Sequence, residues 1–465
     1  MLTFFDDRRQ FRRRSFLRVG SLSLGGLALS GFVRARAEAA EAKRLATDKS
    51  VIFLFMQGGP SQIETFDPKM TAPVGVRSAT GETATTIPGV TFGGTFSKIA
   101  SLADRIAVVR SFVTGDGNHD IKPIVGKDTF GANLGSIYSR VAGTNHPVTG
   151  IPTNVALYPQ AVDASTRPTT MNFGKFDSTG GLGAAFAPFD PSGGSDLQKD
   201  MKLSLSTDRL DDRRTLLAKL DRVKWTLTES GALDGMDQMR QQAFGTILGG
   251  VADAFDLSKE NAKTVARYDT APQVRPENID RKWNNYNNYV DNAKSLGKLL
   301  LLARRLCERG CGFVTITTNF VWDMHSDVNN AGVEEGMRYM GMPFDHAVSA
   351  FLEDVESRGL ADKILLVCCG EMGRTPMINK NGGRDHWGNL APLLLSGGGL
   401  KMGQVIGQST RDAGEPLSEP YSIKHLIATI MHTLFDVGEL RVVRGLPRDI
   451  AGTMTGWEPI PGLLG

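Results

Sequence analysis

The stretch Val51-Ile52-Phe53-Leu54-Phe55-Met56 is apolar throughout and stops at Gln57-Gly58-Gly59-Pro60. An apolar run without polar alternation, closed by Gly and Pro, is typical of a strand that is buried on both faces of a sheet. The same pattern predicts further buried strands at 106–109, 155–158, 313–318, 364–368 and 391–395.

Helical patterns separate the later strands. We expect helices at about 290–309, 343–357 and 422–435, with Pro343 in the first turn of the second, where no hydrogen bond needs its missing N–H. Strands that alternate with helices predict an α/β fold with a doubly wound, mostly parallel sheet. Because ligands bind beyond the carboxyl ends of the strands in such sheets, the residues that follow each strand are the candidate site residues.

The composition fits a globular protein with a large core. The 465 residues are 41% hydrophobic and 22% charged, and four Cys are too few for a disulfide scaffold. We expect one α/β domain over residues 40–465, with a helical insertion at about 200–300, where Leu interleaves with charged residues. The four Cys show no zinc-type spacing and are either buried thiols or, in an oxidising compartment, disulfide partners: Cys307, Cys311, Cys368 and Cys369.

The first 39 residues have the layout of an export signal. Arg12-Arg13-Arg14-Ser15-Phe16-Leu17 precedes an apolar, Gly-rich stretch at 19–33, and Ala37 and Ala39 offer cleavage sites. The arginine pair resembles a twin-arginine signal, which predicts a periplasmic or extracellular protein exported in the folded state. The alternative is an uncleaved anchor, although this stretch is shorter than the roughly 20 residues that span a bilayer.

The net charge gives no reason to expect a nucleic-acid partner. The whole chain carries +3, but residues 1–37 hold eight Arg and two Asp and so contribute +6 by themselves. The remainder is therefore close to neutral, at −3, and lacks the excess of positive charge that attracts phosphate backbones. No further apolar stretch is long enough to span a membrane, so no stable span is expected after signal cleavage.

Histidine is scarce and collects beyond the predicted strands. Of the seven His residues, three follow strands and lie within two residues of an Asp: His119, His325 and His386. Imidazole and carboxylate are usual ligands of zinc, manganese or iron, and a dication offsets the charge of an anionic ester during hydrolysis. Arg374, close to Glu371, is a candidate for holding an oxyanion.

Each of these residues also has a purely structural interpretation. The alternatives are a loop cap for His119, a local turn for Asp323 and His325, an ion pair for Glu371 and Arg374, and a hydrogen bond to Asp385 for His386. The four segments together favour a site more strongly than any one of them alone.

The same segments resemble a known family. The matching stretches are Phe55-Met56-Gln57-Gly58-Gly59-Pro60-Ser61, Phe66-Asp67-Pro68-Lys69, Trp322-Asp323-Met324-His325, Gly370-Glu371-Met372-Gly373-Arg374-Thr375-Pro376 and Gly383-Arg384-Asp385-His386-Trp387. The combination resembles the bacterial exported family named domain of unknown function 1501 (DUF1501), over about 50–440. That family is similar in fold to the alkaline phosphatase and sulfatase superfamily.

The resemblance implies one or two dications held by Asp and His at strand ends, and a Ser, Thr or modified Cys nucleophile. This chain departs from that pattern in two places. Gln57 stands where the first strand usually ends in an Asp, and Glu371-Met372 stands where an Asp-His pair is usual. Ser111 and Thr114 are the hydroxyls nearest to the nucleophile position.

The leading hypothesis is an exported metal-dependent hydrolase that acts on a phosphate or sulfate ester of a small molecule or glycan. It expects one divalent ion (zinc, manganese or calcium) held by four ligands: Asp323, His325, Glu371 and His386. Arg374 would orient the oxyanion, and His119 would act as acid, base or nucleophile. Three residues are expected to contact the substrate: Gln57, Ser61 and Asp385. The alternative is a non-catalytic protein on the same fold that binds a glycan or a partner protein.

Overall fold

The computed structural model describes residues 45–192, 251–317, 319–443 and 446–464. Within these residues, seven strands form one sheet in the order β12-β4-β11-β8-β1-β7-β6. The predicted export signal at 1–39 lies outside the described residues, and so do residues 200–250 of the predicted helical insertion. Both therefore stay predictions.

The predicted first strand lies inside the sheet. β1 (Ser50–Phe55) is buried at every residue. It pairs in parallel with β7 (Phe313–Thr317) on one side and with β8 (Ile364–Cys369) on the other, and β6 (Asn154–Leu157) continues in parallel beyond β7. The carboxyl ends of these four strands consequently lie at one edge of the sheet.

The opposite side of the sheet contains one reversed strand. β11 (Leu393–Gly397) runs antiparallel to both β8 and β4 (Ala107–Val109), whereas β12 (Gln404–Ile406) is parallel to β4. The prediction of a mostly parallel α/β sheet is thus confirmed. The sequence did not predict β12, because its three residues are too few and too exposed to give an apolar run.

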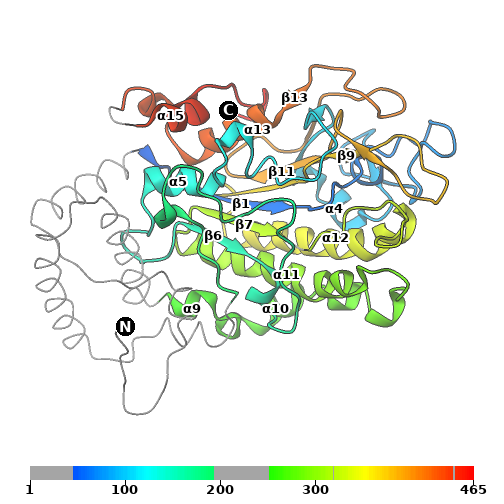
Figure 1. Cartoon of the computed structure of the whole chain (residues 1–465), viewed down its shortest axis with the longest axis horizontal. Coiled ribbons are helices and arrows are strands. Elements are labelled where there is room, and N and C mark those ends of the chain that lie inside the picture. The colour runs from blue at the N-terminus through cyan, green and yellow to red at the C-terminus, as the bar shows by residue number, and fades with distance from the viewer. Residues whose placement is uncertain (1–44, 193–250, 318, 444–445, 465) are drawn as a thin grey trace, which may run out of the picture.

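Helices cover both faces of the sheet (Figure 1). α11 (Tyr286–Glu308) and α12 (Val333–Ser357) pack on one face in a core that includes Leu54, and α13 (Ile423–Leu434) packs on the other in a core that includes Phe53. Successive residues of β1 therefore enter two different cores, which explains why the whole strand is apolar.

The predicted start of α12 is wrong. The helix begins at Val333, so Pro343 lies inside it rather than in its first turn. Acidic residues stand at the start of the helix, and the turns before Pro343 contain the buried residues Met337 and Met340. The buried face of the helix is therefore continuous on both sides of the proline. Burial of this face in the core that α12 shares with α11 outweighs the disruption that a proline causes inside a helix.

The cysteine alternatives are resolved in favour of buried thiols. All four Cys are buried and none forms a disulfide. Burial raises the pKa of the Cys307 thiol to about 12. Among the described residues, no helix is both long and apolar enough to cross a membrane.

A buried ion pair anchors the loop that enters β10 (His386–Trp387). Arg384 Nη2 lies 2.8 Å from Glu64 Oε1, and both side chains are fully buried. Glu64 belongs to α3 (Gln62–Thr65), directly after the turn that ends β1, and it also accepts a hydrogen bond from Ser78 Oγ at 2.8 Å. The pair therefore ties the end of β1 to the segment that carries His386.

Removal of Arg384 should destabilise the protein strongly. Arg384→Met leaves the Glu64 carboxylate buried without its partner, so we expect the free energy of unfolding to fall by about 3–5 kcal/mol. Arg338→Met is the control, because Arg338 pairs with Glu334 at 3.8 Å on the exposed surface of α12 and should cost about 0–0.5 kcal/mol. Urea unfolding measures both variants, and equal losses would contradict the assignment.

Candidate metal centre

Four potential metal ligands gather beyond the carboxyl ends of the strands. One donor atom of each lies within 4.8 Å of the donors of the other three: His119, Asp323, His325 and His386. His119 follows β5 (Phe112–Val113), the next two follow β7, and His386 begins β10. Residues more than 250 positions apart in sequence thus meet at the edge of the sheet where the pattern predicted a site.

Asp323 is the centre of this cluster. Its Oδ1 lies 2.9 Å from His325 Nε2 and 3.5 Å from the Nε2 atoms of His119 and His386. The four donors of a tetrahedral ion with bonds of about 2.0–2.1 Å are separated by about 3.3 Å. The three distances from Asp323 Oδ1 therefore fit one ion among three nitrogens and one oxygen.

Two further observations fit an ion at this point. The Nε2 atom of His386 is buried and makes no hydrogen bond, as expected for an atom that faces an ion. Burial alone would raise the pKa of Asp323, but hydrogen bonds from His119 and His325 outweigh it and hold that pKa far below its ordinary value. Asp323 is consequently an anion at neutral pH, as a ligand must be.

Two carboxylates hold the imidazole rings from behind. His119 Nδ1 lies 3.0 Å from Glu371 Oε1, and His325 Nδ1 lies 3.3 Å from Asp385 Oδ1. A carboxylate that accepts the Nδ1–H orients the ring with Nε2 toward the cluster, which is the usual arrangement around metal-binding histidines. Both Nε2 atoms face Asp323 Oδ1, and His325 Nε2 also lies 3.2 Å from Arg374 Nη1. Burial acts to lower the pKa of His119, but the carboxylates of Asp323 and Glu371 outweigh it and raise that pKa.

The structure places Glu371 and His119 differently from the prediction. Glu371 was expected among the ligands, but it lies behind His119, where it is fully buried and accepts the Gly58 N–H at 3.0 and 3.2 Å. His119 was expected to act as acid, base or nucleophile; the structure places it among the four potential ligands, and its role stays a prediction.

Arg374 is also placed differently from the expected oxyanion clamp. It lies in β9 (Gly373–Arg374), is fully buried, and pairs through Nη2 with Asp323 Oδ1 at 2.5 Å. Its Nε donates to Gly59 O at 2.7 Å, and its Nη2 donates to Gly58 O. These partners occupy the guanidinium, which therefore fixes Asp323 and the turn after β1 instead of facing a ligand.

The three residues expected to contact substrate have three different environments. Ser61 caps α3, since its Oγ accepts the N–H groups of Ile63 and Glu64. Gln57 is buried, with its Nε2 3.5 Å from Thr170 O and its Oε1 without a partner. Only Asp385, whose side chain is 60% exposed, faces solvent beside the cluster.

The two hydroxyls nearest to the nucleophile position do not join the cluster. Ser111 is fully buried and packs beside Gly407, and the Thr114 hydroxyl donates to Gly388 O at 3.5 Å. Two aromatic residues that the sequence did not single out, Phe173 and Phe320, contact the His119 ring instead. They lie in irregular segments and have no spacing that would have indicated a site.

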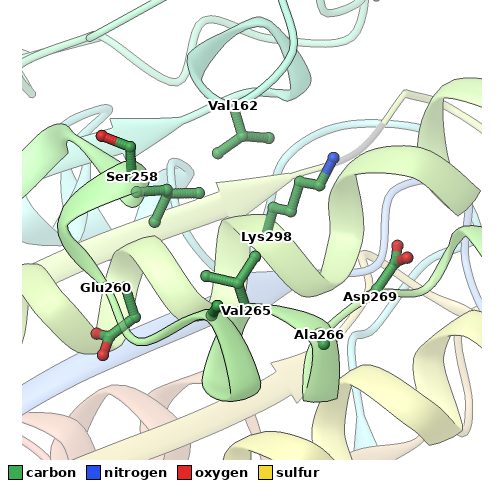
Figure 2. Close-up of a pocket in the computed structure, with 9 residues that line it drawn as sticks. Val162, Ser258, Glu260, Val265, Ala266, Asp269 and Lys298 are labelled. Carbon is green, nitrogen blue, oxygen red and sulfur yellow. The ribbon is translucent and has the colours of Figure 1, made fainter.

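A separate hollow lies away from this cluster (Figure 2). It measures about 520 Å³, and its lining includes Val162, Val265 and Lys298. Its lining residues include no histidine, and its Glu260 is already paired with Arg304 at 2.6 Å. The hollow therefore offers no metal-ligating chemistry of the kind seen around Asp323.

The turn after β1 can be built only with glycine at Gly58. Its φ is +113°, and a Cβ there would lie 2.6 Å from Asp323 N and 2.9 Å from Trp322 N. This close approach lets the Gly58 N–H reach Glu371 and brings the β1 turn against the Asp323 loop.

Gly58→Ala should therefore disturb the site as well as the fold. We expect a loss of about 3 kcal/mol or more in unfolding free energy, since a left-handed φ costs about 1–2 kcal/mol and overpacking about 1–3 kcal/mol. Gly81→Ala is the control: its φ is +78° but its Cβ would meet nothing within 4 Å, so only the first cost applies. Thermal or urea unfolding compares them, and a smaller loss for Gly58→Ala would refute the close approach.

Comparisons with known proteins found solved structures that are similar to this chain at low identity. No curated protein matches the chain. The PsFucS1 sulfatase from Pseudoalteromonas sp. is similar at 11% identity and a TM-score of 0.33, over 91% of this chain and 72% of that one. Ps i-CgsB in complex with k-i-k-neocarrahexaose is similar at 11% identity and a TM-score of 0.31, over 83% of this chain and 72% of that one. Likeness at this level does not bear on activity.

The family evidence is of a different kind, because it covers most of the chain. The family described as "Protein of unknown function (DUF1501)" matches residues 48–450. The protein therefore belongs to the DUF1501 family.

Proposed function

We propose that this protein is a metal-dependent hydrolase of sulfate or phosphate esters. The observation that carries the proposal is the convergence of three histidine Nε2 atoms on Asp323 Oδ1, at 2.9–3.5 Å, at the carboxyl edge of the sheet. The ester in this proposal is that of a small molecule or a glycan.

The donor set favours zinc or manganese. Three of the four donors are imidazole nitrogens, whereas calcium takes six to eight oxygen ligands, so calcium, which the sequence left open, fits poorly. When bound, the ion would supply positive charge that offsets the ester's anionic oxygens.

The chain's own residues orient the donors and handle the proton. Glu371 and Asp385 fix the tautomers of His119 and His325, and Arg374 holds the Asp323 carboxylate in place. Since neither Ser111 nor Thr114 joins the cluster, we assign the attack to water, which breaks the bond from sulfur or phosphorus to the ester oxygen and releases an alcohol. A hydrogen bond from Asn379 lowers the pKa of Asp385, so this exposed carboxylate beside His325 is ionised at neutral pH. It would accept the proton of water as the oxygen attacks and return that proton to the leaving alcohol oxygen.

The proposal also includes a location for the protein, in the periplasm or outside the cell. The Arg13-Arg14 pair and the apolar stretch after it support export by the twin-arginine route. A protein exported in the folded state could acquire its ion before it leaves the cytoplasm, which suits a centre whose potential ligands come from three separate segments of the chain.

Metal content tests the centre directly. Protein purified without chelator should hold about one equivalent of zinc or manganese, and His325→Ala and His386→Ala should lose it, because each removes one of four ligands. Glu371→Gln should keep the ion with an affinity about 10–100-fold lower, since it perturbs a residue behind a ligand. His432→Ala, on α13, is the control. Mass spectrometry of the metal decides, and unchanged content in both ligand variants would refute the centre.

Hydrolysis tests the reaction. With 4-nitrophenyl sulfate and 4-nitrophenyl phosphate, Asp323→Asn should lower kcat/KM by more than about 100-fold, because it removes the anionic ligand around which the cluster forms. Asp48→Asn is a matched control, since Asp48 pairs with Lys363 on the surface at the opposite edge of the sheet. Wild-type protein that retains its ion and hydrolyses neither ester, nor any of a wider ester panel, would favour the non-catalytic alternative.

A further inference from the structure

A stacked pair of aromatic rings borders the candidate metal centre. The ring centroids of Phe173 and Phe320 are 4.5 Å apart, with an interplanar angle of 27°. Both rings contact His119, with centroid distances of 5.1 Å from Phe173 and 4.5 Å from Phe320. Both side chains are only half-buried, so the pair presents apolar surface to solvent directly beside a ligand of the cluster.

Packing of the fold does not account for this pair. Neither ring belongs to the hydrophobic cores on the two faces of the sheet or to the side chains packed against them. Phe173 lies in an irregular segment that reaches the end of β1 through the contact of Gln57 Nε2 with Thr170 O at 3.5 Å, and Phe320 lies in the loop beyond β7. Two separate segments therefore bring aromatic rings to the same side of the cluster.

The two sides of the cluster differ in polarity. His119, against the aromatic pair, is the least exposed of the three histidines at 13%, whereas His325 and His386 are 22% and 32% exposed. Beyond His325 lies Asp385, which accepts a hydrogen bond from Asn379 Nδ2 at 3.0 Å. The cluster is thus open over His325 and His386, with an apolar wall on one side and polar groups on the other.

We propose that Phe173 and Phe320 bind the ring of the substrate's alcohol portion, so that the protein selects sulfate or phosphate esters of ring-bearing alcohols over those of short acyclic ones. This inference rests on the proposed function, because the anionic end of the ester must lie at the cluster. The alcohol portion then extends over the cluster's open side, along the aromatic wall. An aryl ring and the flat face of a pyranose both offer the surface that stacks on phenylalanine.

Binding of sulfonates tests the inference without requiring turnover, because their carbon–sulfur bond resists hydrolysis. The probes are benzenesulfonate, 6-deoxy-6-sulfoglucose and methanesulfonate, titrated by NMR into the full mature protein supplied with one equivalent of zinc. We expect at least one of the ring probes to bind about three- to tenfold more tightly than methanesulfonate. The tighter ring probe identifies whether the alcohol is aryl or sugar.

The double variant Phe173→Leu/Phe320→Leu keeps the apolar volume and removes the flat rings. It should abolish the ring preference and leave methanesulfonate affinity unchanged, whereas Phe189→Leu, whose ring packs on Phe255 away from the cluster, should keep the preference. Equal binding of all three probes by the wild type, binding of none, or a ring preference that survives in the double variant would overturn the inference. An equal loss for all three probes would also overturn it, since the pair would then only position His119. Ring preference without hydrolysis of any ester would refute the proposed activity and leave the ring-binding surface standing.

Discussion

The buried carboxylate of Asp323 and its pairing with Arg374 hold the site together. A buried anion is unfavourable unless nearby groups offset its charge, and Arg374 Nη2 at 2.5 Å and three imidazoles surround this one. The same guanidinium binds the carbonyls of Gly58 and Gly59. The Arg374 side chain therefore joins the turn after β1 to the loop after β7. A change in the charge of Asp323 would consequently alter the contacts of both segments.

The topology of the sheet explains how distant residues meet. β1, β7 and β8 are parallel neighbours, so the segments that follow them meet at one edge and bring Gly58, Asp323 and Glu371 together. β11 then returns antiparallel, and the chain between β8 and β11 forms the β9–β10 pair, in which Arg374 lies opposite His386. The β9–β10 hairpin therefore carries both Arg374, which holds the Asp323 carboxylate, and His386, the last of the four potential ligands.

Much of the fold and part of the site could be predicted from the sequence. Runs such as Val51–Met56 identify buried strands, and three scarce histidines close to aspartates identify the potential ligands that follow them. The placement of Glu371 behind His119, and the burial of Arg374, could not be predicted, because they depend on which side chain points inward once several loops meet. Ser61 shows the same limit, since its role as a helix cap depends on where the next helix begins. Phe173 and Phe320 gave no signal, because an isolated aromatic residue in a loop has no periodicity to interpret.

The central claim is that one ion lies among three histidine nitrogens and Asp323. A crystal of the protein supplied with zinc, measured on both sides of the zinc absorption edge, locates that ion by its anomalous scattering. We expect a single strong peak about 2.0–2.2 Å from Asp323 and from the Nε2 atoms of His119, His325 and His386, with Glu371 beyond bonding distance. A peak bound by Glu371 in place of His119, a peak elsewhere, or no peak in well-ordered crystals would contradict the account.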